Sequence, residues 1–141
     1  MSRAVEDTNR RMLRARDAMD RDYAQPLDVP TLARIAYVSE AHFIRTFRAT
    51  FGETPHRYLQ RRRVERAMFL LRETDRSVSE ICLDVGFASL GSFGRTFRDI
   101  VGESPTSYRL RAGDLRAVPA CFSKAWMRPS SFGEASERAA S

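Results

Sequence analysis

The chain has 141 residues, which is enough for one compact domain or two very small lobes, and its composition is that of a soluble globular protein. No apolar run approaches the roughly 20 residues of a membrane-spanning helix and the N-terminus lacks the apolar core of a signal peptide, so we expect a cytoplasmic protein. The 24 Lys and Arg residues outnumber the 18 Asp and Glu residues, and 23 of these 24 cations are arginine. A GC-rich genome would explain the preference for arginine over lysine, but the net positive charge favours a nucleic-acid partner.

The first part of the chain predicts two helices. Residues 1–9 are expected to form a flexible leader. Apolar side chains at steps of three and four residues then predict an amphipathic helix over 10–23, which Gln25-Pro26 would end. Asp28 is a candidate N-cap for a short helix over 29–36, because its carboxylate can accept a hydrogen bond from a free N–H group of the first turn.

A third helix is expected from Glu40 to about Phe51, with Ser39 as its N-cap. Its phenylalanines recur at every fourth residue and form a stripe for burial, at positions 43, 47 and 51. Gly52 follows where the end of a helix favours left-handed backbone. A short helix, a tight turn and a second helix make a helix-turn-helix, although periodicity alone would suit any helical bundle.

The second half of the chain follows the same order. The later helices are expected over 56–73, 79–85, 90–101 and 105–111. Ser77 and Glu80 form a capping box at the start of the second of these, since each side chain can bond the other residue's backbone N–H. Beyond Ala112 there is no sustained period. The apolar stretch 118–127 either packs on the domain or belongs to a flexible tail or partner contact.

Two stretches of twenty residues, 39–58 and 89–108, are copies of one another. Ten of the twenty paired positions are identical, in the order Ser, Phe, Arg, Thr, Phe, Arg, Gly, Glu, Pro and Tyr. The preceding helices match at an offset of 49 rather than 50, so one extra residue is expected near 86–88. We therefore expect an all-α chain with a first helix-turn-helix lobe over 10–55, a linker helix over 56–73, a second lobe over 74–111 and a partly disordered extension over 112–141.

The second copy resembles the signature of the AraC/XylS-type transcription regulators. The resemblance is carried by Val85-Gly86-Phe87, Ser89, Phe93, Arg95, Phe97-Arg98, Gly102, Ser104-Pro105 and Tyr108-Arg109. It implies two homeodomain-like helix-turn-helix lobes joined by one long helix, with the second helix of each lobe in the major groove of double-stranded DNA. It also implies a stand-alone regulator that binds DNA as a monomer, or else a DNA-binding half expressed without its partner domain. Activators of this type commonly contact RNA polymerase, which is therefore a second expected partner.

The candidate DNA-binding residues lie on the outward sides of the two recognition helices, away from the phenylalanines, with His42 and Ile44 on the flanks of the first helix. On the first helix they are Ala41, His42, Ile44, Arg45 and Arg48, and on the second they are Leu90, Gly91, Ser92, Gly94, Arg95 and Arg98. By family position, residues 41, 44 and 45 match base-contacting sites. Arg45 is best suited to bind guanine O6 and N7, and Arg48 to bind a phosphate.

The second recognition helix has fewer side chains that could contact bases than the first. Its two glycines remove side chains and each costs about 1 kcal/mol of helix stability relative to alanine. Either the backbone approaches DNA closely there, or this lobe binds mainly phosphates, so we expect the first lobe to carry most of the base readout. A linker helix of about 18 residues spans roughly 27 Å, against roughly 34 Å between successive major-groove segments. Either the width of the lobes makes up the difference or the DNA bends toward the protein, and we expect half-sites in pseudo-direct repeat on one face of the DNA, with some bend.

Two other functions compete with sequence-specific DNA binding. An enzyme is disfavoured, because His42, His56, Cys82 and Cys121 show neither a nucleophile–base spacing nor a metal-ligand spacing. No cofactor, metal or catalytic residue is therefore expected, and Cys82 is interpreted as a core residue. The other rival is a basic adaptor that contacts RNA polymerase or another acidic protein and has mainly non-specific affinity for DNA.

Overall fold

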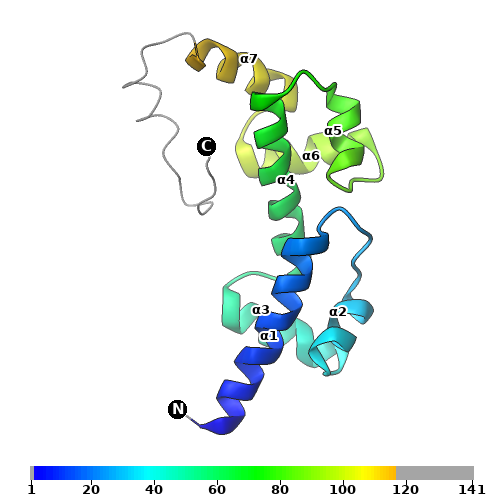
Figure 1. Cartoon of the computed structure of the whole chain (residues 1–141), viewed down its shortest axis with the longest axis vertical. Helices are drawn as coiled ribbons and strands as arrows, with labels where there is room; N and C mark the ends of the chain where they lie inside the picture. The colour runs from blue at the N-terminus through cyan, green and yellow to red at the C-terminus, as the bar shows by residue number, and fades with distance from the viewer. Residues whose placement is uncertain (1, 117–141) are drawn as a thin grey trace. The chain divides into compact units, whose positions relative to one another are not determined.

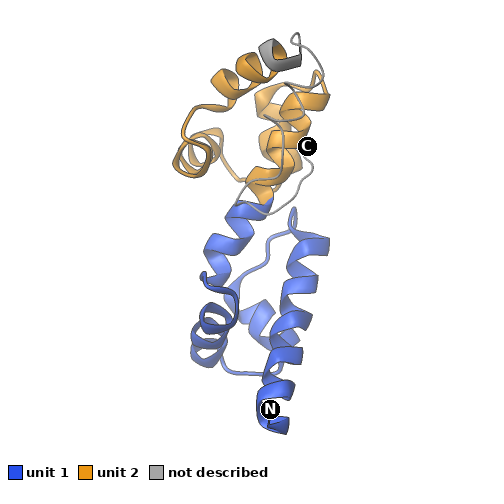
Figure 2. Ribbon diagram, turned by 90° about the vertical axis from the view of Figure 1, so that its left-hand side faces the viewer, with its two compact units in different colours: residues 1–62 blue, residues 63–141 orange. Residues whose placement is uncertain are grey.

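The computed structural model of the chain describes residues 2–116 and is built from helices (Figure 1). These are α1 (Arg3–Asp22), α2 (Val29–Ala36), α3 (Glu40–Phe51), α4 (Pro55–Glu73), α5 (Val78–Asp84), α6 (Leu90–Val101) and α7 (Pro105–Arg116). No strand occurs within the described residues, so the all-α class is confirmed. The chain divides into two compact units, Met1–Arg62 and Arg63–Ser141, with the boundary inside α4 (Figure 2).

The helix at the N-terminus begins earlier than expected. α1 starts at Arg3, where the side chain of Ser2 accepts a hydrogen bond from the N–H of Val5 at 3.2 Å. The flexible leader predicted over 1–9 is therefore wrong from residue 3 onward. The first part of α1 has no buried side chain, so the sequence there shows no apolar periodicity from which a helix could be predicted. It also contains no glycine or proline, so nothing prevents the helix from forming.

The last described helix is longer than expected. α7 continues to Arg116, whereas the sequence predicted an end near residue 111. Ala112 is buried and extends the packed face of the helix by one turn, and Gly113 is accommodated in open space without ending it. The remainder of the predicted extension, 117–141, including the apolar stretch and Cys121, lies outside the described residues.

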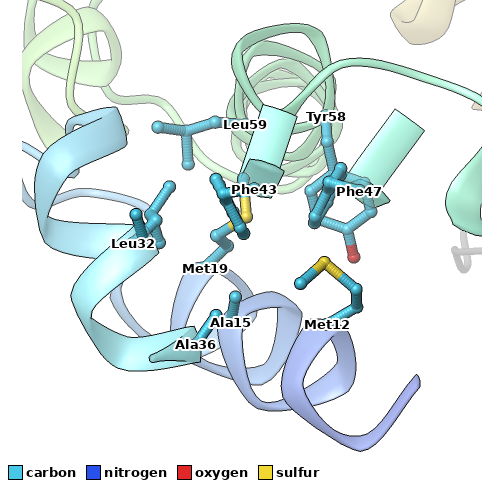
Figure 3. Packing of buried hydrophobic residues seen from close by; sticks show 10 residues of the cluster. Met12, Ala15, Met19, Leu32, Ala36, Phe43, Phe47, Tyr58 and Leu59 are labelled. Carbon is cyan, nitrogen blue, oxygen red and sulfur yellow. The ribbon is translucent and has the colours of Figure 1, made fainter. Parts of the chain in front are cut away.

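The core of unit 1 is formed by α1, α2, α3 and the start of α4. Its buried members include Met12, Ala15, Met19, Leu32, Ala36, Phe43, Phe47, Tyr58 and Leu59 (Figure 3). The residues from α1 are three or four positions apart and so lie on one face, which explains why the helix packs by a single side. Phe51, expected to complete the phenylalanine stripe, is only partly buried, and the guanidinium of Arg16 lies 4.7 Å from its ring centre.

Both units build their cores around the same row of aromatic rings. In unit 1 the centre of the Phe47 ring lies 5.5 Å from that of Phe43 and 5.6 Å from that of Tyr58. In unit 2 the equivalent distances from Phe97 are 5.7 Å to Phe93 and 5.8 Å to Tyr108. These edge-to-face and tilted contacts are the favoured geometries for aromatic pairs. The repeat in the sequence is therefore a repeat of a core.

A partly buried ion pair is repeated in the two units as well. Glu53 and Arg61 approach to 2.8 Å in unit 1, and Glu103 and Arg111 approach to 2.7 Å in unit 2. In each case the same guanidinium also lies over the tyrosine ring that ends the aromatic row. Each pair fastens the loop after one helix to the next helix. The repeat thus extends three residues beyond its predicted end, to positions 61 and 111.

Candidate nucleic-acid interface

The first helix-turn-helix is set by local capping interactions. The carboxylate of Asp28 accepts a hydrogen bond from the N–H of Thr31 at 2.9 Å and starts α2. The hydroxyl of Ser39 accepts one from the N–H of His42 at 3.3 Å and starts α3. Gly52 ends α3 with φ 81°, in the left-handed region where glycine is favoured. All three of these caps were predicted from the sequence and are confirmed.

The predicted DNA-binding residues of α3 share one exposed face. Ala41, His42, Ile44, Arg45 and Arg48 are all exposed, while Phe43 and Phe47 on the opposite side of the helix are fully buried. Ile44 is an apolar residue that is 39% exposed on the same helix as these polar residues. The face therefore offers guanidinium groups and small apolar groups together. Contact of these residues with DNA stays a prediction.

The second helix-turn-helix repeats this arrangement with a different surface. Ser89 caps α6 through the N–H of Ser92 at 3.1 Å, and Gly102 ends it with φ 96°. The predicted residues Leu90, Gly91, Arg95 and Arg98 are exposed, and Ser92 and Gly94 are partly exposed. The predicted capping box at the start of α5 is present, with bonds of 3.0 and 2.9 Å between Ser77 and Glu80.

The extra residue in the second turn is Ala88. In the first turn Tyr37 N–H donates to Arg34 and Val38 N–H to Ala33; in the second, Gly86 and Phe87 make the matching bonds to Leu83 and Cys82, all at 3.1 Å. The two turns therefore correspond, at an offset of 49, as far as Val38 and Phe87. Ala88 is then added before the cap of α6.

The two glycines of α6 are not required by packing inside the protein. A Cβ atom built at Gly94 would meet no atom within 4 Å, and one at Gly91 would lie in ordinary contact with the Arg95 guanidinium at 3.4 Å. Neither residue has positive φ. Alanine would therefore fit at both positions, and the bare backbone of α6 has no explanation within unit 2.

Several arginines outside the recognition helices are held by carboxylates. Ion pairs hold Arg11, Arg21, Arg61, Arg62, Arg76 and Arg111. By contrast, within the described residues no carboxylate pairs with the four arginines of the recognition helices, which are Arg45 and Arg48 on α3 and Arg95 and Arg98 on α6. These four guanidinium groups are exposed and available to an external anion.

The linker arginines do not form one basic surface. Arg62 is held by Asp20 at 3.1 Å, and Arg61 is held by Glu53 in the ion pair described above. Arg63 is half-buried against the ring of Phe87, and burial lowers the pKa of its guanidinium. Only Arg66 of the four is exposed, and it lies over the ring of Phe69.

The net charges of the two helix-turn-helix segments have opposite sign. Residues 29–51 contain three arginines and one glutamate, which gives +2. Residues 78–101 contain two arginines against Glu80, Asp84 and Asp99, which gives −1. A polyanion would therefore be attracted more strongly to the first segment than to the second.

Cys82 is buried in unit 2, as expected of a core residue. Its sulfur lies 3.9 Å from the carbonyl oxygen of Phe87, and burial raises the pKa of the thiol. Among residues 2–116, no group of three or more His, Cys, Asp and Glu side chains is placed to hold a metal ion. No helix in this range is long and apolar enough to cross a membrane.

One cluster beside the interface was missed by sequence reasoning. Tyr37, in the turn between α2 and α3, adopts left-handed backbone with φ 59° and contacts Arg11 and Arg14 of α1. The signal that would have found it is the alignment of the repeats, since Tyr37 stands where the second copy has Gly86. A tyrosine at a position that favours glycine requires a reason.

Comparison with known proteins assigns the chain to a family. A family model described as a helix-turn-helix domain matches residues 32–111. The regulatory protein SoxS of Salmonella typhimurium is 32% identical over 93 residues, which cover 66% of this chain and 87% of SoxS. An uncharacterised helix-turn-helix transcriptional regulator of Haemophilus influenzae is 38% identical over 81 residues, 57% of this chain and 27% of that protein. The chain spans about a third or less of the length of this and two similar regulators.

Solved structures show the same architecture. The DNA-binding domain of AdpA, in complex with a target DNA, matches with a TM-score of 0.70 and 34% identity over 77% of this chain and 97% of that domain. An AraC-type regulator from Chromobacterium violaceum matches with a TM-score of 0.68 and 28% identity, over 74% and 93% of the two chains. The residues matched by the family model include both recognition helices, the linker helix and the residues that carried the sequence resemblance. The chain belongs to the helix-turn-helix family of AraC-type DNA-binding domains.

Proposed function

We propose that the chain is a sequence-specific transcriptional regulator that acts in the cytoplasm and binds double-stranded DNA with α3 and α6. The observation that carries this proposal is the matched set of exposed arginines on these two helices, which no carboxylate of the described residues neutralises. An interface for DNA needs unpaired cations, since phosphate contacts supply much of the affinity. The similarity of the chain to the DNA-binding domain of AdpA, whose structure contains a target DNA, supports DNA binding.

The first recognition helix carries most of the base readout in this proposal. Arg45 lies at the centre of the exposed face of α3 and donates two hydrogen bonds to guanine O6 and N7. Ala41 and Ile44 contact thymine methyl groups, and Arg48 binds a phosphate. His42, next to the capped N-terminus, flanks the same groove. The net charge of +2 over residues 29–51 favours this lobe as the stronger binder.

The second recognition helix contributes mainly phosphate binding. Arg95 and Arg98 provide the charge, and Leu90 and Ser92 stand at the start of the helix. Gly91 and Gly94 present backbone where α3 presents Ala41 and Ile44, so fewer base edges are distinguished. Because one chain holds both helices, it engages two groove segments without a partner subunit, and we propose that it binds as a monomer.

The test uses DNA fragments selected from the source genome for binding, together with a random duplex of equal length. Arg45→Ala should weaken binding to the selected duplex by about tenfold to a hundredfold and binding to the random duplex much less. Arg3→Ala, which removes the same charge from an exposed position near the start of α1, is the matched control. Equal loss on both duplexes would make Arg45 a phosphate contact, and no loss on either would refute the interface.

A second candidate is a basic adaptor whose main partner is RNA polymerase or another acidic protein. The unpaired arginines support it too, because they would attract acidic protein as well as DNA. Polymerase contact also fits a DNA-bound regulator, so the two functions are compatible. An adaptor binds selected and random duplexes with equal affinity, whereas a regulator prefers the selected one, and measuring both affinities at the same salt concentration separates them.

A further inference from the structure

The turn before the first recognition helix holds a residue in an unfavourable conformation. Tyr37 has φ 59° and is the one non-glycine residue with positive φ among the described residues. The equivalent position of the second turn is Gly86, with φ 100°. Left-handed backbone brings the Cβ atom of most residues too close to the following carbonyl oxygen, whereas glycine is free of this penalty. Judged by backbone conformation, glycine would therefore be more favourable than tyrosine at position 37.

Packing in the hydrophobic core does not explain why Tyr37 adopts this conformation. Tyr37 is 72% exposed, so burial of its ring does not account for this conformation. The contacts that hold it come from α1 instead. Nη1 of Arg11 donates a hydrogen bond to the Tyr37 carbonyl oxygen at 2.7 Å, and Asp7 orients the same guanidinium at 2.9 Å. The guanidinium of Arg14 lies over the tyrosine ring, 5.4 Å from its centre.

Arg14 and the Tyr37 hydroxyl are therefore an exposed pair of hydrogen-bond donors near the N-terminus of α3. Arg14 is exposed and has no carboxylate partner within residues 2–116, and no partner of the Tyr37 hydroxyl is found there either. Tyr37 precedes Ser39, the cap of α3, by two residues, so the pair stands next to the N-terminus of the first recognition helix. A guanidinium and a phenol hydroxyl are both common donors to the phosphates of DNA.

We propose that Tyr37 and Arg14 bind one backbone phosphate of the DNA at the edge of the groove occupied by α3, with Arg11 as the positioning residue for the turn. This inference rests on the proposed function and adds two residues to its interface. A residue kept in a strained conformation with its side chain exposed indicates a role outside the fold. The second lobe lacks the contact, because Gly86 has no side chain, which adds to the difference in charge between the lobes.

The test compares variants of the full chain on selected and random duplexes. Tyr37→Gly should leave the melting temperature close to that of the wild type, since relief of the left-handed backbone offsets the lost contact with Arg14. Affinity should nevertheless fall by about threefold to tenfold, equally on both duplexes, because a phosphate carries no sequence information. Arg14→Ala should act in the same way and should reduce the log–log salt slope by about 1.

Two further variants isolate the parts of the contact. Tyr37→Phe keeps the ring beneath Arg14 and removes only the hydroxyl, so part of the affinity is lost. Tyr37→Asn is a second way to remove the ring, should the glycine variant be unstable, because asparagine tolerates left-handed backbone. Arg3→Ala is the matched control for charge, since Arg3 is exposed on the same helix and remote in sequence from Arg14. Its salt slope should stay at the wild-type value.

The outcomes separate this inference from the function on which it rests. Wild-type affinity and salt slope in Tyr37→Gly and Arg14→Ala would overturn the phosphate contact, even if Arg45→Ala still lost its preference for the selected duplex. Loss confined to the selected duplex would also overturn it, because Tyr37 would then act by orienting α3. Loss of regulation in cells with unchanged DNA affinity would assign the pair to a protein partner instead. Failure of the wild type to bind any duplex would refute both proposals.

Discussion

On the exposed side of the first recognition helix stand Ala41 and Ile44, where the second helix has Gly91 and Gly94. On their buried sides the same two helices carry identical phenylalanines in matching aromatic rows. Duplication has therefore kept the residues that build a lobe and changed those that face outward. The comparison teaches that a repeat identifies the scaffold, and that differences between the copies locate the specificity.

The largest effect is expected in the shared scaffold. Phe47→Ala and Phe97→Ala each remove a fully buried ring from the centre of an aromatic row, so each should lower the free energy of unfolding by about 3–5 kcal/mol. Urea denaturation followed by circular dichroism measures this loss. Phe51→Ala, at the partly buried end of the stripe, should cost clearly less. A large difference between the first two variants would show that the two cores are not equivalent.

The next effect separates the two recognition helices. Arg45→Ala should reduce the preference for the selected duplex by about 1–3 kcal/mol, because it removes a bidentate contact with guanine. Arg95→Ala, the same change at the matching position, should reduce binding to both duplexes alike. Fluorescence anisotropy at a fixed salt concentration gives the four affinities. If Arg95→Ala also lost discrimination, the second lobe would be a base reader in its own right.

A smaller effect concerns the ion pair that both lobes share. The hydrogen bond from Arg111 lowers the pKa of Glu103, with a further contribution from Ser107. A carboxylate with a depressed pKa stabilises the fold above its unfolded-state value, near 4.5, and this stabilisation disappears as the pH falls through the folded-state pKa. Glu103→Gln should therefore weaken the acid dependence of unfolding and lower stability at pH 7. Denaturation midpoints at pH 7 and pH 3 measure both changes, and an unaltered pH profile would contradict the assignment.

The smallest effect is a gain. Gly94→Ala should raise the free energy of unfolding by about 0.5–1 kcal/mol, because alanine favours helix and the added methyl group meets no atom within 4 Å. Gly113→Ala, an exposed helical glycine of α7 with similar open space, is the control. Unchanged DNA affinity in Gly94→Ala would fit a lobe that binds mainly phosphates. Loss of affinity in this variant alone would show that DNA approaches the α6 backbone closely.

The sequence predicted helix ends best where a single local interaction defines them. A cap depends only on neighbouring residues, and the predicted caps are found as expected. Helices begin after Asp28, Ser39 and Ser77 and end at Gly52 and Gly102. The first turns of α1 were missed because they bury nothing. Contacts between distant residues were out of reach for a different reason, because a single sequence carries no record of them.

The polar partners of the two core tyrosines illustrate this limit. The hydroxyl of Tyr58 donates a hydrogen bond to Asp20 at 2.7 Å, and burial together with this bond raises the pKa of the phenol. The hydroxyl of Tyr108 instead accepts a hydrogen bond from Arg72 at 2.7 Å. The tyrosines are identical in the repeat, yet one faces an acid and the other a base. Which side chains of the candidate interface are exposed could be predicted from helical periodicity, while the contacts of Tyr37 with α1 could not.

The boundary between the units inside α4 has a consequence for how the chain unfolds. Tyr58 and Leu59 belong to the core of unit 1, while Val64, Ala67 and Leu71 are buried residues of unit 2. One uninterrupted helix thus supplies both cores, so melting of either unit would fray the helix on which the other depends. We expect the two units to lose structure in a single cooperative transition, and a chain cleaved between residues 62 and 63 to be less stable on both sides of the cut.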